Sequence, residues 1–320
     1  MRAAHLHELG TPDVIRYGEL DDPVPGPTDV LVEVVATTVN PVDAFVRSGL
    51  FRTPLPMPFV VGRDLAGTVV AAGPGAAGFA PGDAVWCNSL GHAGRQGAAA
   101  QFAVVPIERS YPLPPGVAPE TAVTVAHPAA TAYLALFTHG RLRAGETVAV
   151  AGGAGNVGAA LIVLAAEAGA RVVATASAAD AEYCRSLGAH EVLDYREAGL
   201  GTRRPDLYVD TSGRNDLETV LDRLAFRGRA VILSGATSRP VLPAAALYMD
   251  DRTVTGFVIS HATTAELAKA AAAVNRLLAA GRLRPRATVE LPLSATAEAH
   301  RMLERGDLRG RRVVLRPGVR

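Results

Sequence analysis

Residues 148–177 read VAVAGGAGNVGAALIVLAAEAGARVVATAS, and this stretch decides the fold. An apolar strand, a glycine turn, an apolar helix and a second apolar strand follow one another within about 30 residues, the length of a βαβ nucleotide-binding unit. Gly153, Gly155 and Gly158 fit the pattern G-x-G-x-x-G. In that pattern the first glycine permits a tight turn, the second lets the backbone approach a pyrophosphate, and the third lets the helix pack closely against the strand.

The helix that follows the glycines is expected to begin near Asn156. Its unpaired N–H groups and the positive end of its dipole would then face an anion. Because the strand before the turn and the helix after it are both legible in the sequence, the stretch predicts a dinucleotide site rather than a plain glycine turn.

The end of the second strand indicates which dinucleotide to expect. Sites for NAD usually carry Asp or Glu there, about 20 residues after the glycines, to hold the ribose hydroxyls. Residues 174–177 read ATAS, so no carboxylate at this point would repel a 2′-phosphate, and Ser177 can donate a hydrogen bond. NADPH is therefore favoured, while Asp180 close behind keeps NADH as the alternative.

Length and composition are those of a globular enzyme with two domains. A chain of 320 residues is too long for one ordinary hydrophobic core. Hydrophobic residues make up 49% and charged residues 20%, which excludes a disordered or fibrous chain. The net charge of +1 gives no electrostatic reason to expect nucleic acid or a membrane surface as partner.

The cysteines and the N-terminus favour a cytoplasmic protein. Cys87 and Cys184 are the only cysteines, which excludes a disulfide framework and suits a reducing compartment. The first residues, MRAAHLHE, lack the apolar segment of a signal peptide. The uninterrupted apolar run 157–166 is about half of a membrane span, so no membrane anchoring is expected.

The two halves of the chain differ in pattern. Up to residue 122, short β-type runs at 30–36, 66–72 and 84–86 are separated by Pro and Gly, which predicts a mostly antiparallel β domain. Beyond a helical segment at 120–137, strand-like runs alternate with helical stretches, as in a doubly wound parallel sheet. These runs are 148–151, 171–174, 191–193, 207–210, 230–233 and 253–259.

The end of the chain is predicted to return to the first domain. A long helix at 264–280 is followed by strand-like runs at 287–291 and 312–316, with a helix around 295–305 between them. We therefore expect a discontinuous β domain, 1–122 with 263–320, and a nucleotide-binding domain, 123–262.

Motifs spread over nearly the whole chain resemble one family. They include Pro25-Gly-Pro-x-Asp29, Asn40-Pro-Val-Asp43, Gly62-Arg-Asp-Leu-Ala-Gly67, Thr131-Ala-Tyr-Leu-Ala-Leu, the glycine turn, and Leu187-Gly-Ala-His-Glu-Val-Leu-Asp-Tyr195-Arg. In this order they are similar to the zinc-independent quinone oxidoreductase branch, the zeta-crystallin-like branch, of the medium-chain dehydrogenase/reductases.

The resemblance implies an α/β architecture in which a GroES-like β domain and a Rossmann domain enclose the active site in a cleft. It also implies a homodimer paired through edge strands of the Rossmann sheets. Residues 253–260 read TVTGFVIS, which is β-rich and apolar enough for such an edge.

The resemblance also implies that no zinc is bound. The positions that look equivalent to the catalytic zinc ligands of relatives hold Asn40, Arg63 and His127, and an Arg has no lone pair to offer a metal. Where relatives carry four cysteines for a structural zinc, the sequence offers Cys87, and His92 nearby does not complete a tetrahedral set.

Without a metal to act as Lewis acid, the expected chemistry is direct hydride transfer from NADPH to a conjugated acceptor, a quinone or an α,β-unsaturated carbonyl. The Asn40 amide is the first catalytic candidate, against a structural role in an Asn-Pro turn with Asp43. Arg63 could stabilise an oxyanion, although burial of its charge favours an ion pair with Asp64 or Asp43.

His127 could relay a proton or could cap the helix that continues to residue 137. The resemblance implies that Phe45 and Phe51 lie beside the substrate, where flat apolar rings would stack with a quinone, although aromatics near Pro-rich turns are as often core residues.

On the coenzyme side the resemblance points to Thr131 at the floor of the cleft and to Tyr195 near the 2′-phosphate. A lysine that relatives often place shortly after Ser177 is missing, since Ala181 occupies that position, and Arg196 could compensate. The expected coenzyme contacts are Thr131, Gly153, Gly155, Asn156, Val157, Gly158, Ser177, Tyr195, Arg196, Ser234, Gly235, Phe257, Val258 and Ile259.

Three functions remain open. The first is an NADPH-dependent quinone or enone reductase, and the second is a reductase of one pathway that acts on an enoyl thioester. The third is a non-catalytic nucleotide-binding or RNA-binding protein on the same fold, against which the near-neutral charge and the absence of a basic stripe argue.

Overall fold

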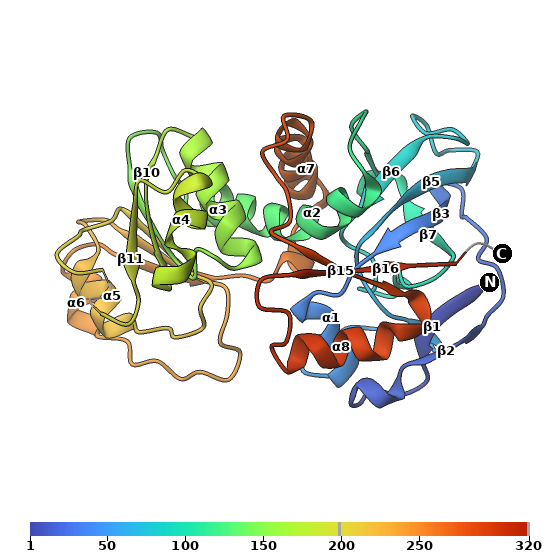
Figure 1. Cartoon of the computed structure of the whole chain (residues 1–320), viewed down its shortest axis with the longest axis horizontal. Coiled ribbons are helices and arrows are strands. Elements are labelled where there is room, and N and C mark those ends of the chain that lie inside the picture. The colour runs from blue at the N-terminus through green and yellow to red at the C-terminus, as the bar shows by residue number, and fades with distance from the viewer. Residues whose placement is uncertain (198–199, 319–320) are drawn as a thin grey trace. The chain divides into compact units, whose positions relative to one another are not determined.

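The computed structural model describes residues 1–197 and 200–318, so the last two residues of the expected segment 263–320 lie outside them. The chain divides into two compact units (Figure 1). Unit 1 consists of Met1–His127 with Leu267–Arg320, and unit 2 is Pro128–Glu266.

Unit 2 is built on a parallel sheet with the strand order β11-β10-β9-β12-β13-β14. The strands are β9 (Thr147–Ala151), β10 (Arg171–Ala176), β11 (Glu191–Asp194), β12 (Leu207–Asp210), β13 (Arg229–Ile232) and β14 (Thr253–Gly256). From β9 the chain builds outward to β11, then returns to the other side of β9 for β12. The order therefore reverses between β9 and β12, the switch point at which ligands bind in open α/β sheets.

Helices cover both faces of this sheet, as the alternating sequence pattern predicts. In Figure 1, α3 (Asn156–Glu167) and α4 (Ala181–Ser186) lie on one face, and α5 (Leu217–Arg223) and α6 (Ala244–Tyr248) on the other. Opposite faces follow from right-handed crossovers built in opposite directions from β9. The prediction of a doubly wound parallel sheet is confirmed.

Unit 1 contains two sheets whose strands are mostly antiparallel. The smaller has the order β2-β1-β4, and the larger runs β15-β16-β3-β5-β6-β8 with β7 paired to β3. The strands are β1 (Arg2–Leu6), β2 (Arg16–Glu19), β3 (Asp29–Thr37), β4 (Phe59–Val60), β5 (Leu65–Ala72), β6 (Ala84–Cys87), β7 (Phe102–Pro106), β8 (Tyr111–Pro112), β15 (Thr288–Pro292) and β16 (Arg312–Arg316).

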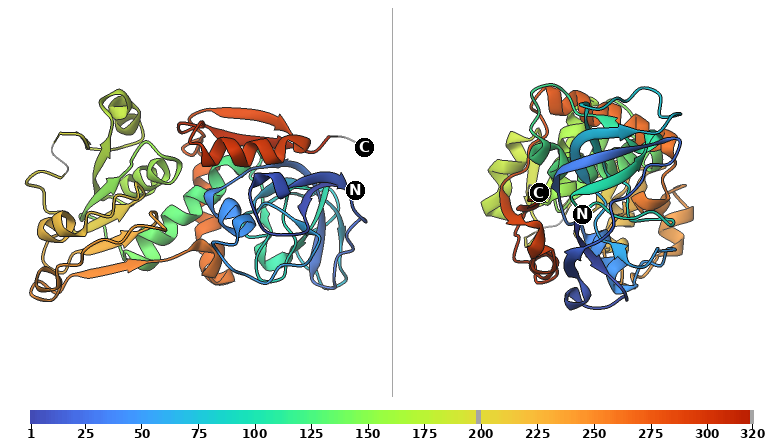
Figure 2. Two further views of the ribbon diagram at one scale, coloured as in Figure 1. Left: turned by 90° about the horizontal axis from the view of Figure 1, so that it is seen from below. Right: turned by 90° about the vertical axis from the view of Figure 1, so that its right-hand side faces the viewer.

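The C-terminal segment completes unit 1. Figure 2 shows α8 (Thr296–Glu304) with β15 and β16, in red, beside the N-terminal elements in blue. β16 pairs with β15 in parallel and with β3 in antiparallel fashion, through Leu315 and Thr37. Buried side chains of this segment, Leu293, Val313 and Leu315, join Leu6 and Phe59 in one hydrophobic cluster.

Two long helices span the boundaries between the units. α2 (Pro119–Tyr133) continues into a π-helical segment, Leu134–His139, and α7 (Thr264–Ala279) leads back to unit 1. No helix in the described part of the chain combines the length and the apolarity that a membrane crossing requires.

Two local features differ from the sequence-based expectation. Asn40 and Pro41 start a helix, α1 (Pro41–Ser48), rather than forming an isolated turn. β14 ends at Gly256, not at Ile259, because its partner β13 ends at Ile232, which is paired with Gly256. Beyond that point no strand of residues 1–197 or 200–318 continues the ladder, and Ile259–His261 forms a 3-10 turn.

Candidate active site

The glycine turn after β9 holds a left-handed residue one position earlier than the sequence pattern suggested. Gly152, and not Gly153, has the positive backbone angle, with φ of +79°. Gly153 is needed for a different reason. A Cβ at this position would lie 2.9 Å from the Ala174 Cβ and 3.3 Å from the Cys184 Sγ, so the glycine lets the turn pack against β10 and α4.

The other two glycines set the approach of α3. Gly158 allows close packing of helix and turn, since a Cβ there would lie 2.1 Å from the carbonyl oxygen of Gly152. Gly155 is the N-cap of α3, which begins at Asn156 as predicted. The nearest atom to a Cβ at Gly155 would be the Gly152 oxygen at 3.3 Å. This glycine is therefore not required for close packing, and its lack of a side chain leaves the N-terminus of α3 accessible to a ligand.

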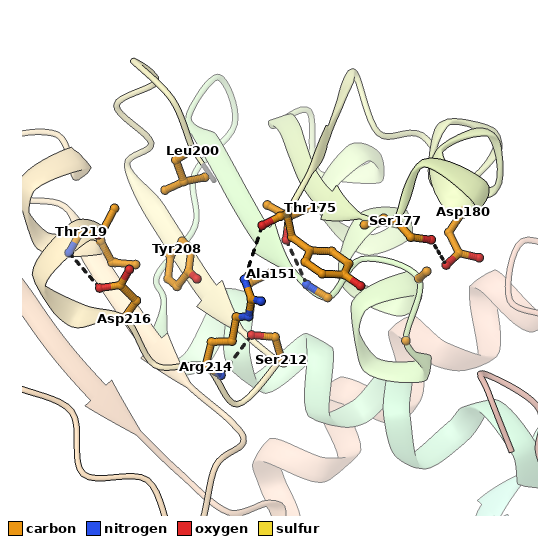
Figure 3. Close-up of a pocket in the computed structure, with 16 residues that line it drawn as sticks. Ala151, Thr175, Ser177, Asp180, Leu200, Tyr208, Ser212, Arg214, Asp216 and Thr219 are labelled. Atoms are coloured by element: carbon orange, nitrogen blue, oxygen red, sulfur yellow. Dashed lines mark hydrogen bonds between the residues drawn. The ribbon is translucent and has the colours of Figure 1, made fainter. Parts of the chain in front are cut away.

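A pocket of about 380 Å³ lies in unit 2 at the carboxyl ends of β9, β10 and β12 (Figure 3). Its wall includes the glycine turn, the end of β10 and the loop that follows β12. The position is the switch point of the sheet, and the volume is in the range of small-molecule sites. A dinucleotide fits this place because the pocket adjoins the N-terminus of α3, where Gly155 would admit an anion to the backbone N–H groups.

Several of the expected coenzyme residues meet at this pocket. Gly155, Ser177 and Tyr195 line it, and Asn156, Val157 and Gly158 form the first turn of α3 beside it. The Ser177 hydroxyl donates to Asp180 at 2.7 Å, and Asp180 also lines the pocket. The end of β10 therefore presents a carboxylate to the site as well as a hydroxyl.

The other expected coenzyme residues do not line this pocket. Arg196 lies beside it, with its guanidinium carbon 5.4 Å from the centre of the Tyr195 ring. In the loop after β13, the Ser234 carbonyl accepts from the Asn215 amide at 3.0 Å, and Gly235 has φ of +85°. The residues placed elsewhere in unit 2 are Thr131 in α2, Phe257 stacked on His139, and Val258 and Ile259 at the following 3-10 turn.

The loop after β12 supplies residues that sequence reasoning missed. The buried Asp210 carboxylate accepts from the backbone N–H groups of Ser212, Gly213 and Asn215 at 2.7, 3.1 and 2.9 Å. It also accepts from the Ser212 hydroxyl at 2.7 Å. This carboxylate fixes the loop and places Ser212 and Arg214 on the pocket wall. An Asp at the end of a strand next to the switch point, followed by Thr-Ser-Gly-Arg, was the available signal.

Unit 1 contains a second candidate region, a group of polar side chains that are all at most 6% exposed. Two carboxylates, two guanidinium groups, an imidazole and an amide meet there. We call this group the buried polar cluster; it consists of Asn40, Asp43, Arg63, Asp64, His127 and Arg312.

The start of α1 positions two members of the cluster. Asn40 is the N-cap, Pro41 is the first helical residue and Asp43 is the third. The Asn40 backbone N–H donates to Asp43 Oδ2 at 2.7 Å, which is one half of a capping box. The Asn-Pro pair thus opens a helix, since proline is favoured at its first position, and the structural alternative of an Asn-Pro turn takes the form of a helix start.

Both ends of the Asn40 amide are used within the cluster. Nδ2 donates to Asp64 Oδ2 at 2.9 Å and lies 3.4 Å from Asp43 Oδ2, while Oδ1 accepts from Arg312 Nη2 at 2.8 Å. Asp64 Oδ1 in turn lies 2.9 Å from His127 Nδ1. Asp64 therefore links the amide to the imidazole, and Arg312 fixes the amide from the other side.

Arg63 is the least satisfied member of the cluster. It is 2% exposed, and its Nε lies 3.9 Å from Asp43 Oδ1, the ion pair that burial led us to consider. Among the described residues, neither Nε nor Nη2 has a hydrogen-bond partner. Burial lowers the pKa of Arg63, and the carboxylates of Asp43 and Asp64 act in the opposite direction.

The Asp43 carboxyl is also perturbed. Burial, followed by the negative charge of Asp64, raises its pKa to about 6, against the opposing effect of Arg63. A buried guanidinium with unused donors can stabilise an oxygen that gains negative charge. An imidazole held at Nδ1 by a carboxylate is oriented to exchange a proton at its other nitrogen.

The described residues contain no group of three His, Cys, Asp or Glu side chains that could hold a metal ion. Asp64 and His127 are two potential ligands, but Arg63 adjoins them. Cys87 is buried, which raises the pKa of its thiol to about 11. The absence of zinc remains a prediction.

The two phenylalanines lie in different surroundings. Phe45 is on α1 and is 37% exposed. Phe51 packs against the hydrophobic cluster of unit 1, and its ring centre is 5.7 Å from that of His92. Phe45 is thus available for contact with a ligand, whereas Phe51 also serves the core.

Known proteins match both units. The Alcohol dehydrogenase GroES-like domain family matches residues 26–115, and the Zinc-binding dehydrogenase family matches residues 156–276. The quinone oxidoreductase of Rattus norvegicus is 30% identical over 310 residues, 94% of this chain and 93% of that protein.

Solved structures agree over almost the full length. An NAD-dependent alcohol dehydrogenase is 32% identical with a TM-score of 0.87, covering 99% of this chain and 100% of that one. The quinone oxidoreductase of Escherichia coli complexed with NADPH is 25% identical with a TM-score of 0.85, at 99% and 100% coverage. The GroES-like and Rossmann units, their order along the chain and these matches show that the chain belongs to the zinc-independent quinone oxidoreductase branch of the medium-chain dehydrogenase/reductase family.

Proposed function

We propose that the protein is an oxidoreductase that transfers hydride from NADPH to a quinone or an α,β-unsaturated carbonyl without zinc. Family membership and the pocket of unit 2 support the nicotinamide coenzyme. The observation that carries the choice of acceptor is Arg63, which stands where zinc-dependent relatives are expected to hold a metal ligand. Its guanidinium is buried, and its Nε and Nη2 form no hydrogen bond with the part of the chain that the structure describes.

Residues of unit 2 are assigned to binding the coenzyme. Gly155 and the first turn of α3, Asn156 to Gly158, would take the pyrophosphate on backbone N–H groups. The end of β10 and Tyr195 would hold the adenosine. For the nicotinamide half we retain Thr131, Ser234, Gly235 and the segment 257–259. When bound, the nicotinamide supplies the hydride.

Residues of unit 1 are assigned to the acceptor. Hydride adds to the β-carbon of an enone or to a quinone, and the electron pair moves onto the carbonyl oxygen. Arg63 donates hydrogen bonds to that oxygen and offsets its charge. His127, held by Asp64, supplies the proton that completes the reduction.

Asn40 positions these groups rather than reacting, because its amide is engaged by Asp64 and Arg312. The exposed ring of Phe45, with Phe51 behind it, offers an apolar surface for the acceptor. Conjugated acceptors suit this arrangement because they need no metal to become electrophilic.

The proposal includes a homodimer and excludes nucleic acid and membranes as partners. β14 is the edge of the parallel sheet and offers its unpaired backbone groups to a second copy. The net charge of +1 provides no attraction for a polyanion. We expect the protein to act in the cytoplasm.

The test is oxidation of NADPH by the full-length protein with a panel of acceptors: a small quinone, an enone, an enoyl thioester and a simple ketone. We expect turnover of the quinone or the enone, and the same rate after dialysis against a chelator. Reduction of the simple ketone alone, or loss of activity with chelator, would overturn the proposal. Turnover of the enoyl thioester alone would favour the pathway-specific alternative, and salt-dependent RNA binding without any turnover would favour the non-catalytic one.

A further inference from the structure

We propose that Arg214, in the loop after β12, is the residue that makes the protein prefer NADPH by binding the 2′-phosphate. This inference rests on the proposed function, since it concerns the same coenzyme. The sequence assigned the 2′-phosphate to Ser177 after β10 and to Tyr195 and Arg196 after β11. The contacts in the structure instead favour the opposite wall of the pocket, formed by the loop after β12, as the main binding site of the 2′-phosphate.

The end of β10 is a poor anion site by itself. The Ser177 hydroxyl donates its proton to Asp180 Oδ2 at 2.7 Å, so it is not available to a phosphate oxygen. Asp180 lines the same pocket, and its carboxylate would repel a phosphate. Ala181 stands where relatives often carry a lysine. A preference for the phosphorylated coenzyme therefore requires a cation from another element.

Arg214 is the guanidinium on the pocket wall. Figure 3 shows Ser212 and Arg214 rising from the loop after β12, with Ser177 and Asp180 toward the other side of the pocket. The Arg214 guanidinium carbon lies 5.1 Å from the centre of the Tyr195 ring, and Nη1 donates to the Tyr195 carbonyl at 3.4 Å. Tyr195 thus holds this cation beside the residues that adjoin the ribose in the proposal.

The base of Arg214 is rigid. Asp210 holds the backbone of Ser212, Gly213 and Asn215 through three N–H hydrogen bonds, as described above. The backbone N–H of Arg214 itself donates to the Ser212 hydroxyl oxygen at 3.3 Å. A side chain on a fixed loop loses less conformational entropy when it binds, so more of its interaction energy appears as affinity.

Arg214 also has the chemistry that a phosphate requires. A guanidinium carries five N–H donors in a planar fork and can bind a phosphate through two parallel hydrogen bonds. Its hydrogen bond to the Tyr195 carbonyl uses one of these donors. Arg196 lies 5.4 Å from the same ring but does not line the pocket, so it adds positive charge without direct contact.

The test compares binding of two coenzyme fragments that differ by the phosphate. Titration calorimetry of the full-length protein with 2′,5′-ADP and with 5′-ADP reports this site without any turnover. We expect the wild-type protein to prefer 2′,5′-ADP. Arg214→Gln should lower the affinity for 2′,5′-ADP by about tenfold or more, as for loss of a charge-assisted hydrogen bond. The affinity for 5′-ADP should stay within about twofold of the wild-type value.

Two further variants complete the comparison. Arg196→Gln is the matched control and should weaken the binding of 2′,5′-ADP by less than about threefold, because this side chain does not line the pocket. Asp180→Asn should strengthen 2′,5′-ADP binding, because it removes the repelling carboxylate. Arg214 is exposed, so the fold should tolerate its replacement, which the thermal midpoint checks.

The outcomes separate this inference from the proposed function. Three results would refute the role of Arg214 without contradicting the coenzyme site. The wild-type protein could bind both fragments equally, Arg214→Gln could weaken the binding of both fragments equally, or Arg196→Gln could weaken the binding of 2′,5′-ADP more than Arg214→Gln does. Failure of the wild-type protein to bind either fragment or NADPH would instead refute the proposed function itself.

Discussion

Arg63 carries a positive charge into a site where water cannot solvate it. Within the described residues, Arg63 forms one ion pair, from Nε to Asp43 Oδ1 at 3.9 Å, and neither Nε nor Nη2 forms a hydrogen bond. Unpaired buried donors are costly and therefore rare in folded proteins. Removing one partner of a buried ion pair leaves the other charge uncompensated and destabilises the fold, so a purely structural role of Arg63 predicts a loss of stability rather than a specific loss of kcat.

We therefore expect Arg63→Met to lower kcat by about 100-fold or more, as for removal of an oxyanion donor, with little change in the dissociation constant of NADPH. Steady-state kinetics with a quinone and a separate coenzyme titration measure the two effects. Arg63→Lys is the control that keeps the charge but loses the fork. A variant with unchanged kcat and altered thermal midpoint would show that Arg63 serves only as a structural cation.

His300 in α8 is a second buried polar group whose hydrogen-bonding atoms are not satisfied within the described residues. It is fully buried, and in the described part of the chain neither ring nitrogen has a hydrogen-bond partner. Burial, aided by the charge of Arg47, lowers its pKa from 6.5 to about 3. Between pH 6.5 and pH 3, His300 is protonated in the unfolded chain but neutral in the folded chain. Its effect on the free energy of unfolding is therefore absent above pH 6.5, and it lowers that free energy increasingly as the pH drops toward 3.

The free energy of unfolding should thus fall between pH 7 and pH 4, by up to about 3 kcal/mol from His300. Asp43 acts in the opposite direction, because its pKa is raised to about 6 and its protonation stabilises the fold as the pH falls. Urea unfolding of His300→Leu beside the wild-type protein separates the two. The variant should lose the decline at low pH, and an unchanged pH profile would contradict the assignment.

At the scale of the element, the glycine turn shows which features the spacing of glycines predicts and which it does not. Spacing alone predicted that α3 begins at Asn156 and that Gly158 permits close packing. It could not predict that Gly152 is the left-handed residue, because four glycines within the seven positions 152–158 are compatible with several conformations of the turn. Which glycine is needed, and why, depends on Ala174 and Cys184, and these belong to other elements.

The two glycines at the start of α3 should respond differently to alanine. Gly158→Ala forces a Cβ to 2.1 Å from the Gly152 oxygen and should cost about 1–3 kcal/mol of stability. Gly155→Ala meets that oxygen at 3.3 Å and should cost less than about 1 kcal/mol. Its main effect should be weaker NADPH binding, because the Cβ would obstruct the pyrophosphate. Urea unfolding and coenzyme titration of both variants measure this, and equal losses of stability would contradict it.

Other elements were missed for identifiable physical reasons. The sequence Asn40-Pro-Val-Asp43 contains the first-turn proline and third-position acid of a helix start, but the helix is too short for a clear apolar period. The loop after β12 depends on Asp210, whose buried carboxylate acts only on residues within five positions of it. That local signal was legible, whereas the contact between Arg214 and Tyr195 required the fold.

For the whole molecule, the order of patterns along the chain was enough to predict a GroES-like unit and a Rossmann unit, and family membership confirms both. The buried polar cluster was only partly predictable. Asn40, Arg63 and His127 were found by position, but Arg312 lies 272 residues from Asn40, and no spacing rule connects them. Strand pairing of β16 with β3 is what brings this guanidinium to the amide.

Assembly of the molecule should depend on unit 2. Val241, Leu242, Tyr248 and Met249 are large apolar side chains that stand 47–70% exposed in and around α6, close in sequence to the edge strand β14. Such residues, next to a free sheet edge, are typical of a contact with a second copy. We expect a dimer in sedimentation velocity experiments.

Replacing Tyr248 and Met249 together by Asp should shift this dimer toward monomer without unfolding the chain, since both side chains are exposed. Val24→Asp, at an 85% exposed position of unit 1, is the control and should leave the association unchanged. A wild-type monomer, or a double variant that remains fully dimeric, would rule out this surface as the interface.

The hydrogen bond from Arg312 to Asn40 also has a consequence for biosynthesis. Until β16 has emerged from the ribosome, the carboxylates of Asp43 and Asp64 lack the positive charge of Arg312. Unit 2 is continuous in sequence and can fold as soon as it emerges, but unit 1 must wait for β15, α8 and β16. Translation that stops early would therefore leave a coenzyme-binding half attached to an incomplete partner, a species that quality-control proteases can recognise and remove.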